Sequence, residues 1–212
     1  MKIVIFDMDG TLIDSKTDIT ISVNHIRKLH YGLVLLTKEY VADVINMENR
    51  NLAKLLYGTE VYQDKDKKVF ELHYAKQCMK NPYLYDGILE TLHTLKESDF
   101  KLSVATNAPT QFALIMLKHL KIDSMFDLII GSDKVKVSKP DPEMINKILS
   151  FYGFDSSTDY ACVVGDSSKD MKSAKNAGID SIFAKWGFSP DITHDKIAQT
   201  PQDILKIINK GL

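Results

Sequence analysis

Hydrophobic positions along the chain follow two alternating patterns. Short, almost continuous apolar runs alternate with longer segments in which apolar residues recur every three to four positions. The first pattern is typical of parallel strands that are covered on both faces, and the second is typical of amphipathic helices. The apolar runs predict strands at residues 2–6, 101–105, 127–130, 160–164 and 180–184.

The helical pattern fills the intervals between these runs. It predicts helices at residues 87–98, 110–121, 141–152, 168–177 and 201–210. Asp141 and Pro142 match an N-cap followed by proline at the first helical position, and Gly178 is typical of a helix end. Strands and helices in this alternation favour an α/β fold with a Rossmann-like, doubly wound parallel sheet.

One long interval interrupts the alternation. Between residues 15 and 82 no convincing strand pattern occurs, and apolar residues such as Ile19, Val23 and Ile26 recur at helical spacing. We therefore predict an α/β core formed by residues 1–14 and 83–212, with an inserted α-helical cap domain at residues 15–82. The charged run at residues 64–68 is expected to be a solvated helix face.

The composition excludes several functional classes. There are 27 Lys and Arg residues against 28 Asp and Glu residues, so we expect no general attraction to nucleic acid or to anionic membranes. No apolar run is long enough to span a bilayer, and the N-terminus does not resemble a signal peptide. Cys78 and Cys162 lack the spacing of a metal or redox motif. We expect a cytoplasmic protein.

Acidic residues follow two of the predicted strands. Asp7 and Asp9 come after the first, and Asp166 and Asp170 come after the fourth. Alternate residues of a strand share a face, and ligands of open α/β sheets bind beyond the carboxyl ends of the strands. Neighbouring carboxylates need a cation or a shared proton, and four of them form an oxygen-rich site suited to Mg²⁺. A plainer interpretation is that Asp166 and Asp170 only cap a helix.

Two further segments carry groups suited to binding phosphate. Thr106 and Asn107 follow the second predicted strand at the start of a helix, where backbone N–H groups bind anions readily. Lys139 lies in a proline-flanked loop, and its charge is suited to neutralising a phosphoryl group or the surplus of acids. Taken singly, a loop lysine is usually solvated and a threonine at this position is usually a helix cap.

The order of these segments resembles that of the haloacid dehalogenase (HAD) superfamily. The likeness covers the whole chain, including a helical cap after the first motif, and is greatest to the phosphoglycolate phosphatase and β-phosphoglucomutase group. The four motifs of the superfamily are matched in order by Asp7-Met8-Asp9-Gly10-Thr11, by Thr106, by Lys139 and by Gly165-Asp166 with Asp170. Lys185-Trp186-Gly187 after the last strand also resembles that group.

This resemblance implies a Mg²⁺-dependent phosphatase that acts on a small phosphorylated metabolite through an aspartyl-phosphate. It implies that Asp7 is the nucleophile and that Asp9 is first the general acid and then the general base. The other implied roles form two sets. Mg²⁺ is held by the Asp7 carboxylate, the main-chain carbonyl of Asp9, Asp166 and Asp170, while Thr106, the backbone of Asn107 and Lys139 hold the phosphoryl oxygens.

Several alternatives stay open from the sequence. A sugar phosphomutase would use the same core residues, and a non-catalytic phosphate-binding or regulatory protein would keep only the site. The intact set of motif residues argues against the second. The cap stretch 45–50 lacks the glycine usual in such caps, which leaves the substrate open, and Arg50 or Lys54 is a candidate for contacting an anionic group on it. We expect a monomer or a weak homodimer, with neither nucleic acid nor membrane as partner.

Overall fold

A parallel sheet forms the centre of the molecule. The structure is a computed structural model, and it describes residues 1–48, 50–189 and 193–211. The strands of the sheet pair in parallel in the order β5–β4–β1–β6–β7–β8. Their bounds are β1 (Lys2–Phe6), β4 (Phe100–Ala105), β5 (Leu128–Ile130), β6 (Tyr160–Gly165), β7 (Asp180–Ala184) and β8 (Ile197–Ala198). The residues that follow β1 therefore lie at the middle of the carboxyl edge.

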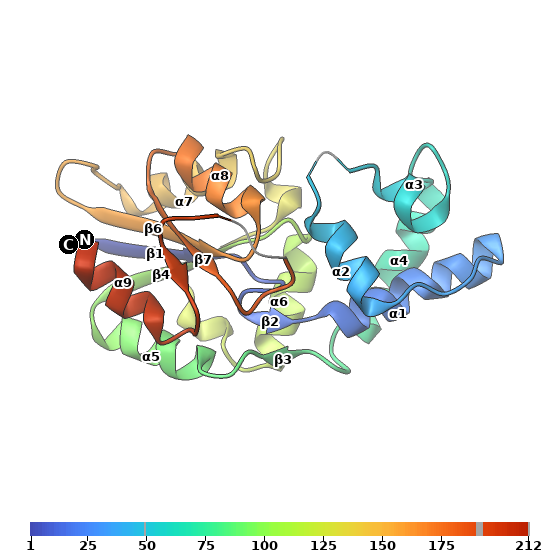
Figure 1. Cartoon of the computed structure of the whole chain (residues 1–212), viewed down its shortest axis with the longest axis horizontal. Coiled ribbons are helices and arrows are strands. Elements are labelled where there is room, and N and C mark those ends of the chain that lie inside the picture. Colours follow the sequence, from blue (N-terminus) through green and yellow to red (C-terminus); the bar gives the residue numbers. More distant parts are fainter. Residues whose placement is uncertain (49, 190–192, 212) are drawn as a thin grey trace.

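Helices cover both faces of this sheet (Figure 1). Alternate residues of β1 enter different cores: Val4 and Phe6 pack in one, and Ile3 and Ile5 pack in the other. This division explains why the strand is apolar throughout. The first core includes residues of α5 (Ile88–Glu97), α6 (Thr110–His119) and α9 (Asp203–Gly211), and the second includes residues of α7 (Glu143–Tyr152) and α8 (Ser168–Asn176).

The predicted parallel sheet and its helices are confirmed, with element ends that differ by at most two residues. The predicted start of α7 is wrong: Pro142 is the N-cap residue, and the Asp141 carboxylate accepts a hydrogen bond from the Glu143 N–H. Two short 3₁₀ helices, η2 (Asp123–Met125) and η3 (Ser132–Lys134), were not predicted either. Elements this short contain too few residues to display a period.

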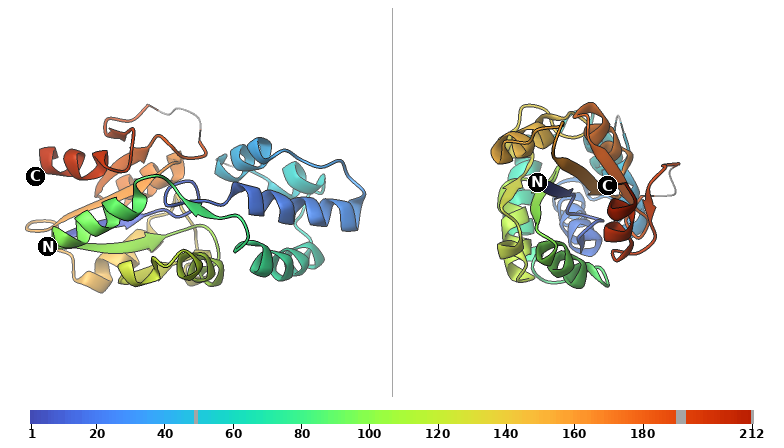
Figure 2. Two further views of the ribbon diagram at one scale, coloured as in Figure 1. Left: turned by 90° about the horizontal axis from the view of Figure 1, so that it is seen from below. Right: turned by 90° about the vertical axis from the view of Figure 1, so that its left-hand side faces the viewer.

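The described residues of the segment 15–82, called the helical lobe below, lie at the end of the molecule opposite the N-terminus (Figures 1 and 2). A core of its own, which includes Val23, Ile26 and Tyr57, holds the lobe together. Its described residues form no strand, in agreement with the sequence pattern, and their helices are α1 (Lys16–Ile26), the π-helix η1 (Arg27–Tyr31), α2 (Lys38–Asn46), α3 (Leu52–Tyr57) and α4 (Asp64–Gln77). The division into core and cap domains stays a prediction.

The chain enters and leaves the helical lobe at one place. Strand β2 (Ile13–Asp14) pairs antiparallel with β3 (Tyr83–Leu84), so that Asp14 lies opposite Tyr83. The Tyr83 hydroxyl donates a hydrogen bond of 2.8 Å to Asp14 Oδ2. This two-stranded pair therefore ties the two connections together.

The charged run at the start of α4 was predicted to be a solvated helix face, and one of its residues departs from this prediction. Asp66 is fully buried, whereas the residues on either side of it are exposed. Its carboxylate pairs with His30 and accepts a hydrogen bond from the Tyr31 hydroxyl. A solvated face was the wrong interpretation here because a buried acid depends on partners distant in sequence.

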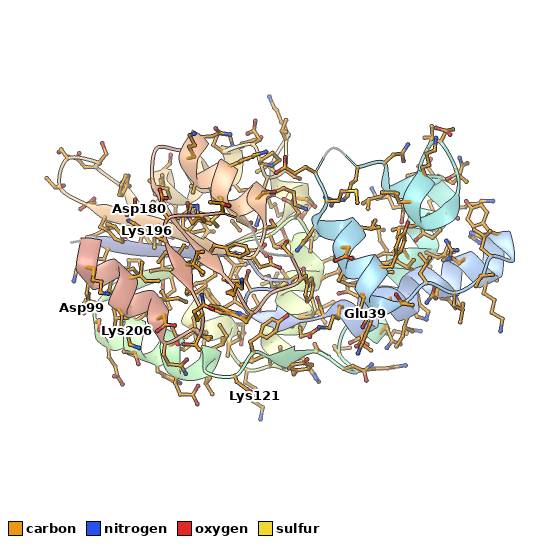
Figure 3. All side chains as sticks on the ribbon, in the orientation of Figure 1. Glu39, Asp99, Lys121, Asp180, Lys196 and Lys206 are labelled. Atoms are coloured by element: carbon orange, nitrogen blue, oxygen red, sulfur yellow. The ribbon has the colours of Figure 1, made fainter. Side chains whose placement is uncertain are left out.

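Charged side chains lie on the outside of the molecule (Figure 3). Lys121 extends away from the surface, and Lys196 pairs with Asp180 at the sheet edge near β8. Cys162 is buried in β6 as expected. Among the described residues, no helix combines the length and apolar character needed to cross a membrane.

Candidate active site

The chain makes a tight turn directly after β1. The Leu12 N–H donates to the Met8 carbonyl at 2.9 Å, and Gly10 has a φ of 87°, which favours glycine. Met8 is buried in the core beneath the turn. Asp7 and Asp9, on either side of it, both line a cavity of about 220 Å³.

Three carboxylates meet at the edge of the sheet beside this turn. Asp7, Asp166 and Asp170 are buried, and one oxygen from each lies within 4.8 Å of the others. They are brought together because β1 and β6 are neighbours and α8 begins just after β6. Lys139 Nζ lies among them and donates hydrogen bonds of 2.6 Å to Asp7 Oδ1 and to Asp170 Oδ1.

The carboxylates outnumber the cation that touches them. Burial raises the pKa of Asp7 to about 7, since the opposing effect of Lys139 is smaller. Burial and the charges of Asp7 and Asp170 also raise the pKa of Asp166 well above its usual range. Burial lowers the pKa of Lys139, but the charges of Asp170 and Asp7 together raise it by more, so the net shift is upward. The cluster is therefore short of positive charge.

A divalent metal ion fits this set of groups. Carboxylate oxygens are the protein ligands that Mg²⁺ prefers. Asp166 Oδ1 is buried and has no hydrogen-bond partner, so this oxygen is available as a ligand. The Asp9 carboxylate is not part of the cluster, and the expected ligation through its main-chain carbonyl stays a prediction.

Asp9 lies beside the cluster in a different environment. Burial raises its pKa to about 6, and a hydrogen bond donated by Ser15 Oγ acts in the opposite direction. A carboxyl group that titrates near neutral pH is suited to giving and taking protons. Sequence reasoning missed Ser15, because nothing in its spacing from Asp9 indicates the contact.

The loop that carries Lys139 is held by Asn107. The Asn107 amide donates to the Lys139 carbonyl and accepts from the Lys139 N–H, both at 3.0 Å. Lys139 is only 5% exposed, so the plainer interpretation of a solvated lysine is wrong. Thr106 lines the cavity, and its hydroxyl accepts a hydrogen bond from the Ala108 N–H. The plainer interpretation of Thr106 as a helix cap is wrong, because Ala108 lies before the helix and Pro109 is the N-cap residue of α6.

Asp170 both caps a helix and belongs to the acidic cluster, so both interpretations of the sequence apply to it. Its Oδ2 accepts hydrogen bonds from the N–H and the hydroxyl of Ser167, which form a capping box at the start of α8. Its Oδ1 binds Lys139 within the cluster. Capping therefore orients this carboxylate instead of excluding it from the site.

The helical lobe contacts this site through the end of α2. Asn46 Nδ2 donates to Asp166 Oδ2 at 3.0 Å, and Lys169 Nζ donates to the Ile45 carbonyl at 2.8 Å. Burial and the nearby charge of Arg50 lower the pKa of Lys169 to about 8. Sequence reasoning missed Asn46 and Lys169, because their contacts depend on how the lobe sits against α8.

A model of the haloacid dehalogenase-like hydrolase family matches residues 4–184. The chain belongs to this family. The resemblance found in the sequence is thereby confirmed, and so is the expectation that the protein is an enzyme, here a hydrolase.

Relatives of this haloacid dehalogenase-like hydrolase match it along its whole length. A phosphoglycolate phosphatase from Aquifex aeolicus is 31% identical, with 100% of this chain and 99% of the relative covered. An N-acetylmuramic acid 6-phosphate phosphatase from Pseudomonas aeruginosa is 27% identical, with 100% and 96% covered. The crystal structure of a predicted phosphoglycolate phosphatase from Haemophilus somnus has a TM-score of 0.83 and 26% identity, covering 98% of each chain.

Proposed function

We propose that this hydrolase is a Mg²⁺-dependent phosphatase that releases phosphate from a small phosphorylated metabolite through an aspartyl-phosphate. The observation that carries the proposal is the buried cluster of Asp7, Asp166 and Asp170 around Lys139. The names of the relatives from Aquifex aeolicus and Pseudomonas aeruginosa support small phosphate esters as the substrate class.

Asp7 is the proposed nucleophile. Its Oδ1 binds Lys139, whereas the one hydrogen bond to its Oδ2 from the described residues is a long contact of 3.5 Å from the Thr11 hydroxyl, so Oδ2 is the less restrained oxygen. In the first step Asp7 attacks phosphorus and the ester P–O bond breaks. Asp9 gives its proton to the leaving oxygen, for which its raised pKa is suited.

The second step returns the enzyme to its starting state. Asp9 takes a proton from a water molecule, and the water oxygen attacks the phosphorus of the aspartyl-phosphate. The bond between phosphorus and the Asp7 oxygen breaks, so that phosphate is released and the Asp7 carboxylate is restored. Thr106, the backbone of Asn107 and Lys139 hold the phosphoryl oxygens in both steps. The helical lobe limits the access of bulk water to the cavity while the acyl-phosphate exists.

Asp7, Asp166 and Asp170 would hold Mg²⁺, together with the main-chain carbonyl of Asp9. When bound, the ion offsets the negative charge of the transferring phosphoryl group. This contribution is distinct from that of Lys139, whose Nζ already contacts Asp7 and Asp170. The proposal therefore predicts that the lysine alone does not support the reaction.

Removal of the metal is the first test. We expect phosphate release from phosphoglycolate, sugar phosphates, nucleoside monophosphates or an aryl phosphate to fall about a hundredfold or more when EDTA replaces Mg²⁺, because several kcal/mol of charge stabilisation are lost. Thermal melting provides a second readout, since an ion that binds the folded state raises the melting temperature.

The same assay separates the alternatives. Net release of phosphate distinguishes a phosphatase from a phosphomutase, which conserves phosphate, and from a binding protein, which releases none. Release that is equal with Mg²⁺ and with EDTA would contradict the metal dependence. No release from any ester would contradict the proposed function as a whole.

Gly10→Ala is expected to lower kcat/KM by about tenfold or more, which corresponds to about 1.4 kcal/mol. A Cβ at this position would lie 2.3 Å from Asp166 Oδ2, and φ is 87° there. The matched control is Gly178→Ala, where φ is 74° and no atom lies within 4 Å of the added Cβ. Both variants are measured by phosphate release and thermal melting, and equal kcat/KM values in the two would argue against this contact.

A further inference from the structure

One side chain of the helical lobe is bonded to the acidic cluster itself. Asn46 is the last residue of α2, and its Nδ2 donates a hydrogen bond of 3.0 Å to Asp166 Oδ2. Among the described residues of the lobe, no other forms a hydrogen bond with the three clustered acids. The proposed chemistry gives this contact no role.

The lobe cations that the sequence singled out do not reach the acids in this way. Arg50 Nη1 donates to the Met47 carbonyl at 2.7 Å, and Lys54 pairs with Glu60 at 3.0 Å. Both of these partners belong to the lobe itself. The direct link from the lobe to the acidic cluster is therefore a neutral amide.

The two oxygens of Asp166 have different surroundings. Oδ2 accepts hydrogen bonds from the Asn46 amide and from the Phe188 N–H, the second at 2.7 Å. Oδ1 is buried, and no described residue donates to it. Donors that hold one oxygen of a carboxylate orient the other oxygen as a metal ligand.

The core confines Asp166 from the opposite side. A Cβ added at Gly10 would lie 2.3 Å from Asp166 Oδ2, and one added at Gly187 would lie 2.2 Å from the Asp166 Cβ. Asn46 closes the side that faces the lobe. Without its amide, the carboxylate keeps only the Phe188 donor and is less restrained in its rotation about the Cβ–Cγ bond.

A neutral donor suits this position. A lysine or arginine here would form an ion pair with Asp166 and repel a metal ion, whereas an amide donates without adding charge. Nδ2 of Asn46 also donates to Ser189 Oγ at 2.9 Å, so both of its hydrogens have acceptors. These two bonds fix the plane of the amide against the core.

We propose that Asn46 is a positioning residue of the metal site: its amide holds Asp166 so that Oδ1 stays available to Mg²⁺, and the helical lobe thereby raises the affinity of the core for the ion. This inference rests on the metal site of the proposed function. Because Asn46 reaches Asp166 only while the end of α2 lies against the core, ion binding and this contact favour each other.

Other contacts also hold the end of α2 against the start of α8. Lys169 Nζ donates to the Ile45 carbonyl at 2.8 Å, and Glu48 binds the Ser168 hydroxyl and Lys172. None of these bonds involves an acid of the cluster. Loss of the amide alone is therefore expected to leave the lobe in place and to act on the metal site.

Calorimetric titration of the whole chain with Mg²⁺ tests the inference. In Asn46→Ala we expect the Kd for Mg²⁺ to rise about tenfold or more, as loss of a partner that orients a metal ligand typically does. The melting temperature in EDTA is expected to stay close to that of the wild-type protein, while the increase caused by Mg²⁺ becomes smaller. A purely structural role would lower the melting temperature in EDTA and leave the Kd unchanged.

Two controls show whether the effect belongs to this amide. Asn146→Ala makes the same change at an exposed position of α7, and Glu48→Gln removes the ion pair with Lys172 while Asn46 is kept. Both are expected to keep the Kd within about threefold of the wild-type value, as loss of an exposed group usually does. An equal rise of the Kd in Glu48→Gln and Asn46→Ala would assign the effect to lobe contact in general and overturn the role of the amide.

The outcome is separable from that of the proposed function. A Kd of Asn46→Ala within about twofold of the wild-type value overturns the positioning role even if phosphate release requires Mg²⁺. A wild-type protein that binds no Mg²⁺ overturns it as well. Phosphate release from the ester panel decides the proposed function independently of either result.

Discussion

Asp7→Asn is expected to reduce Mg²⁺-dependent phosphate release by about a thousandfold or more. An amide cannot attack phosphorus, and removal of a nucleophile eliminates the covalent route itself. The change preserves the shape of the side chain and removes a charge from a crowded acidic cluster. We therefore expect Asp7→Asn to keep the free energy of unfolding of the wild-type protein in EDTA, although its kcat is strongly reduced.

The matched control for this variant is Asp86→Asn. Asp86 is exposed and lies outside the cavities that Asp7 lines, so the same chemical change is expected to leave kcat within about twofold, in line with other surface substitutions. Both variants are assayed with phosphoglycolate and with an aryl phosphate. An Asp7→Asn variant that retained a tenth of the wild-type kcat would rule out an aspartyl-phosphate at this position.

Lys139→Met is expected to lower the free energy of unfolding by about 3–5 kcal/mol in EDTA, because it leaves buried carboxylates without their cation. Lys139 Nζ contacts Asp7 and Asp170 at 2.6 Å, and Asp166 lies in the same cluster. The measurement is urea unfolding at pH 8, with Lys136→Met as the control for an exposed lysine in the same loop.

The loss of unfolding free energy in Lys139→Met is expected to depend on pH. Burial raises the pKa of Asp7 to about 7 even with Lys139 present, so the folded state takes up protons more readily than the unfolded state does. Stability associated with such a group is present at low pH and is lost as pH rises through the folded pKa. The deficit of Lys139→Met is therefore expected to be smaller at pH 5 than at pH 8, and smaller again with Mg²⁺. A loss below 1 kcal/mol at pH 8 in EDTA would contradict the prediction.

The parallel sheet could be predicted because its strands are apolar on both faces. In β1, Ile3 and Ile5 supply one core while Val4 and Phe6 supply the other, which produces an unbroken apolar run in the sequence. The short strands β2, β3 and β8 could not be predicted in this way. Two residues display no period, and each of these strands is defined by a partner distant along the chain.

The acidic cluster could be predicted for a related reason. Parallel strands end at one edge, so acids that follow β1 and β6 must approach each other there. The sequence could not indicate that Ser15 binds Asp9, or that Asn46 binds Asp166. The contact from Asn46 arises from the packing of the helical lobe on the core, which no local pattern encodes.

The pairing of β2 with β3 has a consequence for the history of the fold. Asp14 lies opposite Tyr83, so everything between them begins and ends at one point. Segments with adjacent ends are those that a folded domain can gain, lose or exchange most readily. The described residues of this interval contribute no strand to the six-stranded parallel sheet. A gene with this layout can acquire a new selectivity by recombination in one contiguous stretch, while the codons for Asp7, Lys139 and Asp166 are left unchanged.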